Sequence, residues 1–323
     1  MKMSQEHKIK FLLCLVTVNC NLRCRMCFNW KNNETDEIES SLLKAAISDL
    51  HKKGLFTTDA SVVFAGGEAL LRSDIFELIR FSRDLGLCTT LTTSGYPYND
   101  RIREQLRDSD LTYIALPLDS LQRNVHDNLR GKDGVFDNAM QIIQDFPRKV
   151  TLTCTISAYN INEICEIAEW AEANDNIIGL GFQALVYPFN SQISRDNFHQ
   201  SPEFSHLWPK DISAVCANLN RLIKIKNKSK KIYTTSKHLS FFKEYFRNPA
   251  NINRKVRCRI GDTSLTINNK GGVIFCNYIG QLGNIRELAI TDILSAENVQ
   301  EMKKRMLECR KSCEFYVNCF FED

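Results

Sequence analysis

Three cysteines lie close together near the start of the chain, directly after an apolar stretch. Cys20, Cys24 and Cys27 have the spacing C-x3-C-x2-C, and residues 9–18 before them are rich in branched apolar side chains. Three thiolates this close in sequence can hold a metal centre and leave one coordination position free. A structural metal site normally uses four protein ligands, so the open position indicates chemistry at the metal. The fold must therefore present this loop at an accessible place.

Composition and charge exclude several classes of protein. The 323 residues are 43% hydrophobic and 25% charged, which is typical of a globular chain with a large core. The net charge of +4 is close to neutral for this length, so we expect no nucleic-acid partner. The apolar run 11–18 is too short to span a bilayer, and residues 1–10 lack the apolar segment and cleavage site of a signal peptide. We expect a cytoplasmic protein with no membrane partner.

The first half of the chain alternates strand-like and helix-like segments. The predicted strands are residues 9–18, 60–65, 89–93, 112–118, 150–157 and 177–186, and the predicted helices are residues 40–53, 73–85, 135–146 and 160–173. Ser73 is expected to cap the second helix and Gly86 to end it. Repeated βα units, about six here, predict an α/β fold, a partial (βα)6 parallel barrel with right-handed crossovers. Sites in such sheets lie at the carboxyl ends of the strands, so residues 20–27 are expected on that rim.

The second half of the chain has a different composition. Helices are predicted at residues 212–225 and 239–246, and the lysine-rich run 224–231 is interpreted as solvated, with a patch for phosphate or an acidic partner as the alternative. A hairpin is predicted from strands 263–267 and 273–276, and an amphipathic helix at 291–307 follows it. The sequence thus predicts three domains, which are a core partial barrel (1–187), a helical connector (188–257) and a small cysteine-rich β-hairpin and helix extension (258–323).

A second motif supports a functional role for the cysteine loop. Residues 62–65 are the end of an apolar strand that leads into Gly66, Gly67 and Glu68. Glycines let a ligand approach the backbone closely, and a carboxylate at such a turn can bind an ammonium group. The cysteine spacing followed by this Gly-Gly-Glu turn resembles the radical SAM enzymes. The resemblance implies that the three cysteines hold three irons of a 4Fe–4S cluster, that S-adenosylmethionine chelates the fourth iron, and that Glu68 contacts its amino group.

The same resemblance assigns further residues to cofactor binding. Ser94 and Asp119 follow predicted strands and Ser157 ends one, at places where the family has polar groups. Residues 179–183 lie in the strand whose backbone the family packs against adenine. Met26 stands where the family usually has an aromatic residue, and its adaptable side chain suits adenine packing. The cofactor-binding residues that the resemblance implies are Met26, Phe28, Gly66, Gly67, Glu68, Ser94, Asp119 and Ser157.

Five further cysteines form a second group at the end of the chain. Thirteen cysteines in a cytoplasmic protein indicate metal binding rather than disulfides, because thiols stay reduced there. Cys258, Cys276, Cys309, Cys313 and Cys319 resemble the SPASM and twitch extensions of the superfamily, although the last three have the spacing C-x3-C-x5-C instead of the usual C-x2-C-x5-C-x3-C. The resemblance implies one auxiliary 4Fe–4S cluster, with Cys258, Cys276 and two or three of the others as ligands. A zinc ribbon is the alternative, because four thiolates also suit zinc.

The resemblance implies a radical SAM oxidoreductase that cleaves S-adenosylmethionine to a 5′-deoxyadenosyl radical, with flavodoxin or ferredoxin as electron donor. The leading hypothesis is hydrogen abstraction from a peptide or other natural-product precursor, with net oxidation or cross-linking through the auxiliary cluster. The second is a redox-neutral epimerase or a dehydrogenase of a small molecule such as an aminoglycoside or sugar, in which an inward-facing Cys154 would donate a hydrogen atom. The third is a zinc-stabilised binding module without catalysis.

Overall fold

Nine strands form one continuous sheet in the part of the chain that the structure describes. The computed structural model describes residues 8–32, 34–188, 191, 193, 197–250, 258, 260–309, 313, 317 and 318. The strand order is β6-β5-β4-β3-β2-β1-β7-β8-β9, and every pair from β6 to β7 is parallel. The strands are β1 (Ile9–Thr17), β2 (Phe56–Gly66), β3 (Cys88–Thr92), β4 (Tyr113–Pro117), β5 (Val150–Ile156), β6 (Ile177–Ala184), β7 (Ser264–Ile267), β8 (Gly272–Cys276) and β9 (Gly280–Asn284).

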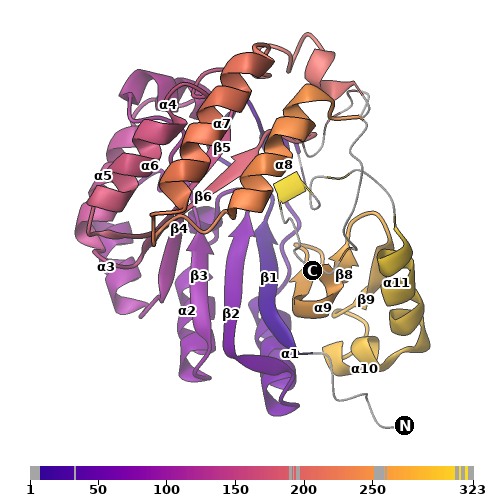
Figure 1. Ribbon diagram of the computed structural model, residues 1–323. Coiled ribbons are helices and arrows are strands. Elements are labelled where there is room, and N and C mark those ends of the chain that lie inside the picture. The colour runs from indigo at the N-terminus through magenta and orange to yellow at the C-terminus, as the bar shows by residue number, and fades with distance from the viewer. Residues whose placement is uncertain are drawn as a thin grey trace.

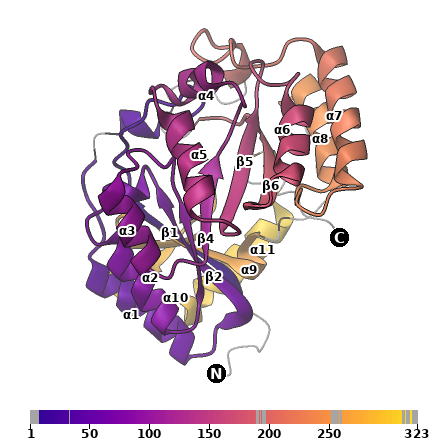
Figure 2. The same ribbon diagram turned by 90° about the vertical axis from the view of Figure 1, so that its left-hand side faces the viewer.

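The first six strands and their crossover helices form the predicted α/β core. The helices are α1 (Ser40–Lys52), α2 (Ile75–Asp84), α3 (Asp100–Asp108), α4 (Arg123–Arg130), α5 (Val135–Asp145) and α6 (Ile164–Ala173). Figures 1 and 2 show these helices along the outer side of a curved sheet. Within the described residues β6 does not pair with β1, so the barrel stays open. The predicted fold class is confirmed.

Apolar periodicity explains how the helices attach to the sheet. The buried residues of α1 recur every three or four positions and are Leu43, Ala46, Ile47 and Leu50. Strand β5 alternates instead, with Val150, Leu152, Cys154 and Ile156 fully buried and the threonines between them half-buried. Since successive side chains of a strand point to opposite faces, the threonines face the inside of the open barrel.

Some local predictions are wrong. Ser73 does not cap α2, because Asp74 stands at the cap position and binds Arg72. Helices α3 and α4 were not predicted, since α3 has only two apolar residues, Ile102 and the buried Leu106, and α4 has only eight residues. Gly86 does end α2, with a left-handed φ of +78°.

The C-terminal extension continues the sheet. Strand β7 pairs in parallel with β1, in the register Phe11 to Ser264, and the predicted hairpin β7–β8 is confirmed. The helix predicted at 291–307 is two helices, α10 (Ile290–Ser295) and α11 (Glu297–Glu308), because Ala296 between them has an extended backbone. Figure 1 shows α9 (Ile260–Thr263), α10 and α11 beside β8 and β9. The domain boundaries 187/188 and 257/258 stay predictions.

Two helices and a short extended segment cover the β6 edge. Helices α7 (Ile212–Lys226) and α8 (Ser236–Arg247) confirm the two predicted connector helices. Between them, Tyr233 N donates to Leu180 O over 3.0 Å and Leu180 N donates to Lys231 O over 2.9 Å, so this segment runs along β6 like a further strand. Every helix in the described residues is too short or too polar to cross a membrane.

Candidate functional site

The three N-terminal cysteines line one cavity at the carboxyl ends of the parallel strands. Cys20, Cys24 and Cys27 are half-buried and border a cavity of about 300 Å³. Arg130 at the end of α4 also lines it. The ends of β2 to β6 contribute further lining residues, among them Gly66, Gly67, Glu68, Thr93, Ser94, Pro117, Thr153, Thr155 and Gln183. The loop is therefore on the rim where the sequence predicts it.

Two glycines press the turn after β2 against the cysteine loop. A Cβ atom on Gly66 would lie 2.1 Å from Thr17 O, and one on Gly67 would lie 2.1 Å from Asn19 O. Both contacts are too short for any side chain. Glu68 N also donates to Asn19 O over 2.8 Å, so the Gly-Gly-Glu turn and the cysteine loop form one rigid wall of the cavity.

Glu68 is buried in this wall with both carboxylate oxygens in hydrogen bonds. Oε1 accepts from Thr93 Oγ1 at 2.5 Å and from Leu70 N at 3.1 Å, and Oε2 accepts from Ser94 N at 2.8 Å. Burial raises the pKa of the Glu68 carboxyl, and these hydrogen bonds oppose that shift. The side chain thereby joins the ends of β2 and β3 while it borders the cavity.

The structure adds Arg130, which the sequence analysis missed. Its guanidinium lies 2.5 Å from Oδ2 of the fully buried Asp119 and hydrogen-bonds the Cys24 thiol. Burial raises the pKa of Cys24 to about 11, and the Arg130 cation opposes that shift. Among the described residues Arg130 Nε is buried without a hydrogen-bond partner. Arg130 is the last residue of α4, a polar helix that the sequence did not predict. Nothing in the sequence distinguishes it from a surface arginine.

Four of the predicted cofactor residues do not line the cavity. Met26 is half-buried against the core, and the buried Phe28 ring packs edge-on against Phe204 with a centroid distance of 6.5 Å. Asp119 and Ser157 are fully buried, and Asp119 Oδ1 accepts from Thr155 N at 2.9 Å. Their part in cofactor binding stays a prediction.

Two residues inside the barrel change the interpretation of strands β5 and β6. The Tyr233 ring covers Gly181, where a Cβ atom would lie 2.2 Å from the ring, so an aromatic side chain occupies the face expected to meet adenine. Gln183, two residues further on the same face, borders the cavity. Thr153 and Thr155 border it as well, and the fully buried Cys154 therefore points away. The inward orientation considered for Cys154 is wrong.

The second cysteine group is partly assembled. Cys276 is buried, which raises the pKa of its thiol, and the neighbouring Cys258 and Cys309 thiols raise it further. Cys313 is buried nearby in sequence, whereas Cys319 lies outside the described residues. The end of the chain reaches the β6 rim, where Asn318 Oδ1 accepts from Ala184 N at 2.9 Å.

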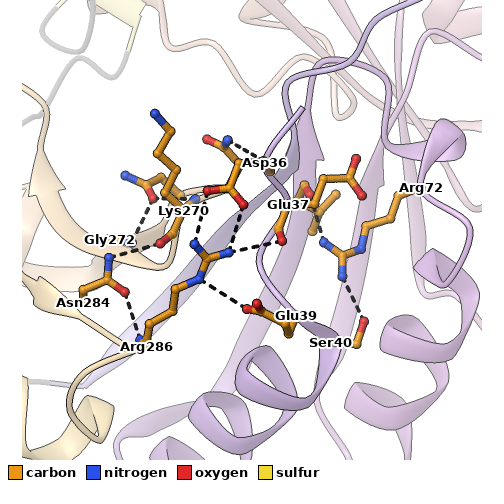
Figure 3. A network of polar contacts seen from close by, with 12 residues as sticks. Asp36, Glu37, Glu39, Ser40, Arg72, Lys270, Gly272, Asn284 and Arg286 are labelled. Atoms are coloured by element: carbon orange, nitrogen blue, oxygen red, sulfur yellow. Dashed lines mark hydrogen bonds and ion pairs between the residues drawn. The ribbon is translucent and has the colours of Figure 1, made fainter. Parts of the chain in front are cut away.

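A polar network attaches the C-terminal extension to the loop that follows the cysteines (Figure 3). Arg286 binds Asp36 through two bonds of 3.0 and 3.1 Å and Glu39 at 3.3 Å. Lys270 binds Glu34 at 2.9 Å. The hydrogen bond to Arg286 lowers the pKa of Asp36. The segment between the cysteine loop and α1 is therefore held from the side of the extension.

The three N-terminal thiols border one cavity, as the ligands of a cluster would. Within the described residues no three His, Cys, Asp or Glu side chains stand close enough to hold one metal ion. In a 4Fe–4S cluster each thiolate binds a different iron, so thiols spaced around a cavity fit this group. The three N-terminal cysteines, the glycine wall and the unpartnered Arg130 Nε together fit a cluster with a ligand at its open iron.

Two family models match the chain. The model of the radical SAM superfamily matches residues 14–171, and that of the SPASM iron–sulfur cluster-binding domain matches residues 258–319. The first domain implies a 4Fe–4S cluster with S-adenosylmethionine, and the second implies further iron–sulfur ligation. Each match contains one of the two cysteine groups.

Curated relatives resemble part of the chain. The Fe-coproporphyrin III synthase of Methanosarcina barkeri is 31% identical over 177 residues, which are 53% of this chain and 43% of that protein. The mycofactocin maturase MftC of Mycolicibacterium smegmatis is 25% identical over 161 residues, which are 48% of this chain and 40% of that protein. The chain thus spans less than half the length of these two relatives.

Solved structures resemble almost the whole chain. SuiB of Streptococcus suis bound to S-adenosylmethionine has a TM-score of 0.68 at 17% identity and covers 98% of this chain and 75% of its own. The anSMEcpe structure with bound AdoMet and Cp18Cys peptide has a TM-score of 0.65 at 16% identity and covers 97% of this chain and 88% of its own. At this identity the likeness shows a common fold.

Proposed function

We propose a reaction for this chain from the premise that it is a radical SAM enzyme with a C-terminal SPASM domain. In the proposed reaction S-adenosylmethionine is cleaved reductively in the cavity of the three cysteines. The resulting 5′-deoxyadenosyl radical then removes a hydrogen atom from a peptide or other natural-product precursor, with net oxidation or cross-linking.

The arrangement of charge in the cysteine cavity carries this proposal. The cluster, when bound, supplies the electron for the cleavage, while the chain orients the cofactor and excludes water. Glu68 and Arg130 both line this cavity, so a carboxylate and a cation stand at two places on its wall. Such a pair suits the ammonium and carboxylate groups of a bound methionine. We propose Glu68 and Arg130 as the residues that orient S-adenosylmethionine.

The substrate class rests on the relatives and on the second cysteine group. MftC is a maturase, and solved structures of similar fold hold a Cp18Cys peptide and the precursor peptide SuiA. The SPASM domain provides a second redox-capable centre, which would accept the electron that an oxidised or cross-linked product must lose. We therefore favour a peptide precursor and an oxidative outcome.

A small-molecule substrate is the second candidate. The Fe-coproporphyrin III synthase relative and the fold of BtrN in complex with 2-DOIA, with a TM-score of 0.51, favour it. A search for mass changes in peptide and small-molecule pools incubated with the reduced enzyme separates the two candidates.

Replacing Cys20, Cys24 and Cys27 together with alanine tests the reaction. We expect this triple variant to lose formation of 5′-deoxyadenosine, because no thiolate remains to hold the first cluster. It should keep about half of about eight irons, because the second cysteine group is intact. Undiminished 5′-deoxyadenosine would refute the proposed site, and a variant without iron would refute the second cluster.

A further inference from the structure

The proposed reaction needs an electron from outside the chain, and the structure offers a surface for its delivery. A shallow hollow of about 590 Å³ lies on the outer side of the cysteine loop, and its lining includes Arg23, Arg25, Tyr96, Asn128 and Lys132. We propose that this basic hollow docks a one-electron carrier protein with an acidic surface. The inference rests on the proposed function, because it assumes that the cluster must be reduced.

The hollow is directly connected to the cluster ligands. Arg23 and Arg25 alternate with the cysteines in the same loop. Arg23 is exposed, yet its Nη1 donates to Cys20 O over 3.1 Å. Its guanidinium also lies 5.2 Å from the ring of Trp30, which borders the cysteine cavity. A carrier seated here would contact the loop that holds the cluster ligands.

The wall of the basic hollow is fixed before any partner arrives. Gly131 ends α4 with a φ of +67°, and a Cβ atom on it would lie 2.2 Å from Arg23 O. Arg25 N donates to Leu129 O over 2.9 Å, and Arg25 Nε donates to Asn128 O over 3.1 Å. Since the loop is held against α4 by these contacts, docking needs little backbone rearrangement.

The exposed charge of the basic hollow selects an acidic partner. Arg23, Arg25 and Lys132 are exposed cations. Asp127 is buried and its carboxylate oxygens accept from Gly134 N and Phe136 N, each at 2.8 Å, so these oxygens are not available to a docked partner. Asp133 is the exposed acid among the lining residues. An excess of positive charge speeds encounter with an acidic protein and makes it depend on salt.

A second basic hollow provides a matched control. Its lining includes Arg221, Lys224 and Lys228 together with Glu169 and Glu172. It lies at the carboxyl end of α6, which leads into the start of β6, and is therefore at the opposite end of the strands from the cysteine loop. Charge reversal there changes the net charge of the protein equally but leaves the proposed docking surface untouched.

Stopped-flow reduction of the reconstituted full chain by reduced flavodoxin, an acidic carrier, tests the inference. One electron leaves the flavodoxin and enters the oxidised cluster, and the loss of cluster absorbance reports the transfer without any cleavage of S-adenosylmethionine. The variant Arg25→Glu/Lys132→Glu is compared with the control Lys224→Glu/Lys228→Glu. Dithionite, a small reductant that needs no docking, reports whether the cluster of each variant is intact and reducible. Binding of oxidised flavodoxin to each protein is a second readout.

We expect the docking variant to be reduced by flavodoxin about tenfold more slowly than wild type, with a weaker dependence on salt. Reduction by dithionite and the control variant should match wild type. Lys132→Glu alone, at an exposed turn outside the cysteine loop, should give a smaller change in the same direction. Equal flavodoxin rates in wild type and docking variant, or an equal loss in the control, would overturn the docking surface. Absence of 5′-deoxyadenosine in a normally reduced wild type would instead refute the proposed function.

Discussion

Glu68→Gln probes the cavity wall with a side chain of equal shape and different hydrogen-bonding capacity. Two backbone N–H groups need the carboxylate, because Leu70 N donates to Oε1 over 3.1 Å and Ser94 N donates to Oε2 over 2.8 Å. Glutamine has one carbonyl oxygen, so its NH2 group must face one of these donors. A buried donor without an acceptor costs about 1–3 kcal/mol, and we expect the free energy of unfolding to fall by about that amount.

The same variant should weaken the binding of S-adenosylmethionine. A hydrogen bond to a charged group contributes about 1.5–3 kcal/mol, so the dissociation constant should rise by about 10-fold to 150-fold. Anaerobic urea denaturation measures the first effect, and equilibrium dialysis at equal cluster content measures the second. Glu77→Gln on α2, where the carboxylate is exposed and pairs with Lys44, is the control. An unchanged stability would refute the hydrogen-bond argument, and an unchanged dissociation constant would remove Glu68 from the cofactor site.

Three further predictions concern buried positions. Gly181→Ala should displace the exposed Tyr233 ring and cost only about 0.5 kcal/mol in urea denaturation, because the added Cβ meets the far end of that side chain; a loss of several kcal/mol would show that the ring cannot move. Burial lowers the pKa of His126 in the folded chain to about 4, whereas the unfolded value is about 6.5. As the pH falls from about 6.5 through 4, the unfolded chain takes up this proton first, and about 3 kcal/mol of stability should be lost. His126→Asn should remove that part of the pH dependence, and identical pH profiles would count against it. Cys154→Ala should keep turnover, and a loss of turnover would contradict the outward facing of this thiol. Product made in D2O should gain no carbon-bound deuterium, and quantitative incorporation would contradict the oxidative outcome.

The parallel core and the first cysteine site could be predicted because their signals are local. Strand periodicity and the order of βα units place the cysteine loop and the Gly-Gly-Glu turn at the same rim without knowledge of distant contacts. Ser94 follows the same rule, since it ends β3 and meets Glu68. The positions of these residues follow from the order of strands and helices along the chain, which can be read from the sequence.

The remaining parts of the site depend on contacts between distant segments. Arg130 reaches the cavity from α4, whose eight residues and polar composition give no clear periodicity. Tyr233 enters the barrel from a segment that pairs with β6 across 53 positions of sequence, as the bond from Tyr233 N to Leu180 O shows. The positions of Arg130 and Tyr233 cannot be predicted from the residues next to them in the sequence.

The pairing of β7 with β1 has a consequence for how the chain can be divided. The backbone of residues 11–14 finds its hydrogen-bond partners on one side in β2 and on the other in β7. A chain ending before β7 would leave that side of β1 as an unprotected edge strand, with apolar residues such as Phe11 and Leu13 along it. Such a truncated core is expected to self-associate through β1. The C-terminal extension therefore keeps the strand that carries the cysteine loop from pairing with another copy of itself.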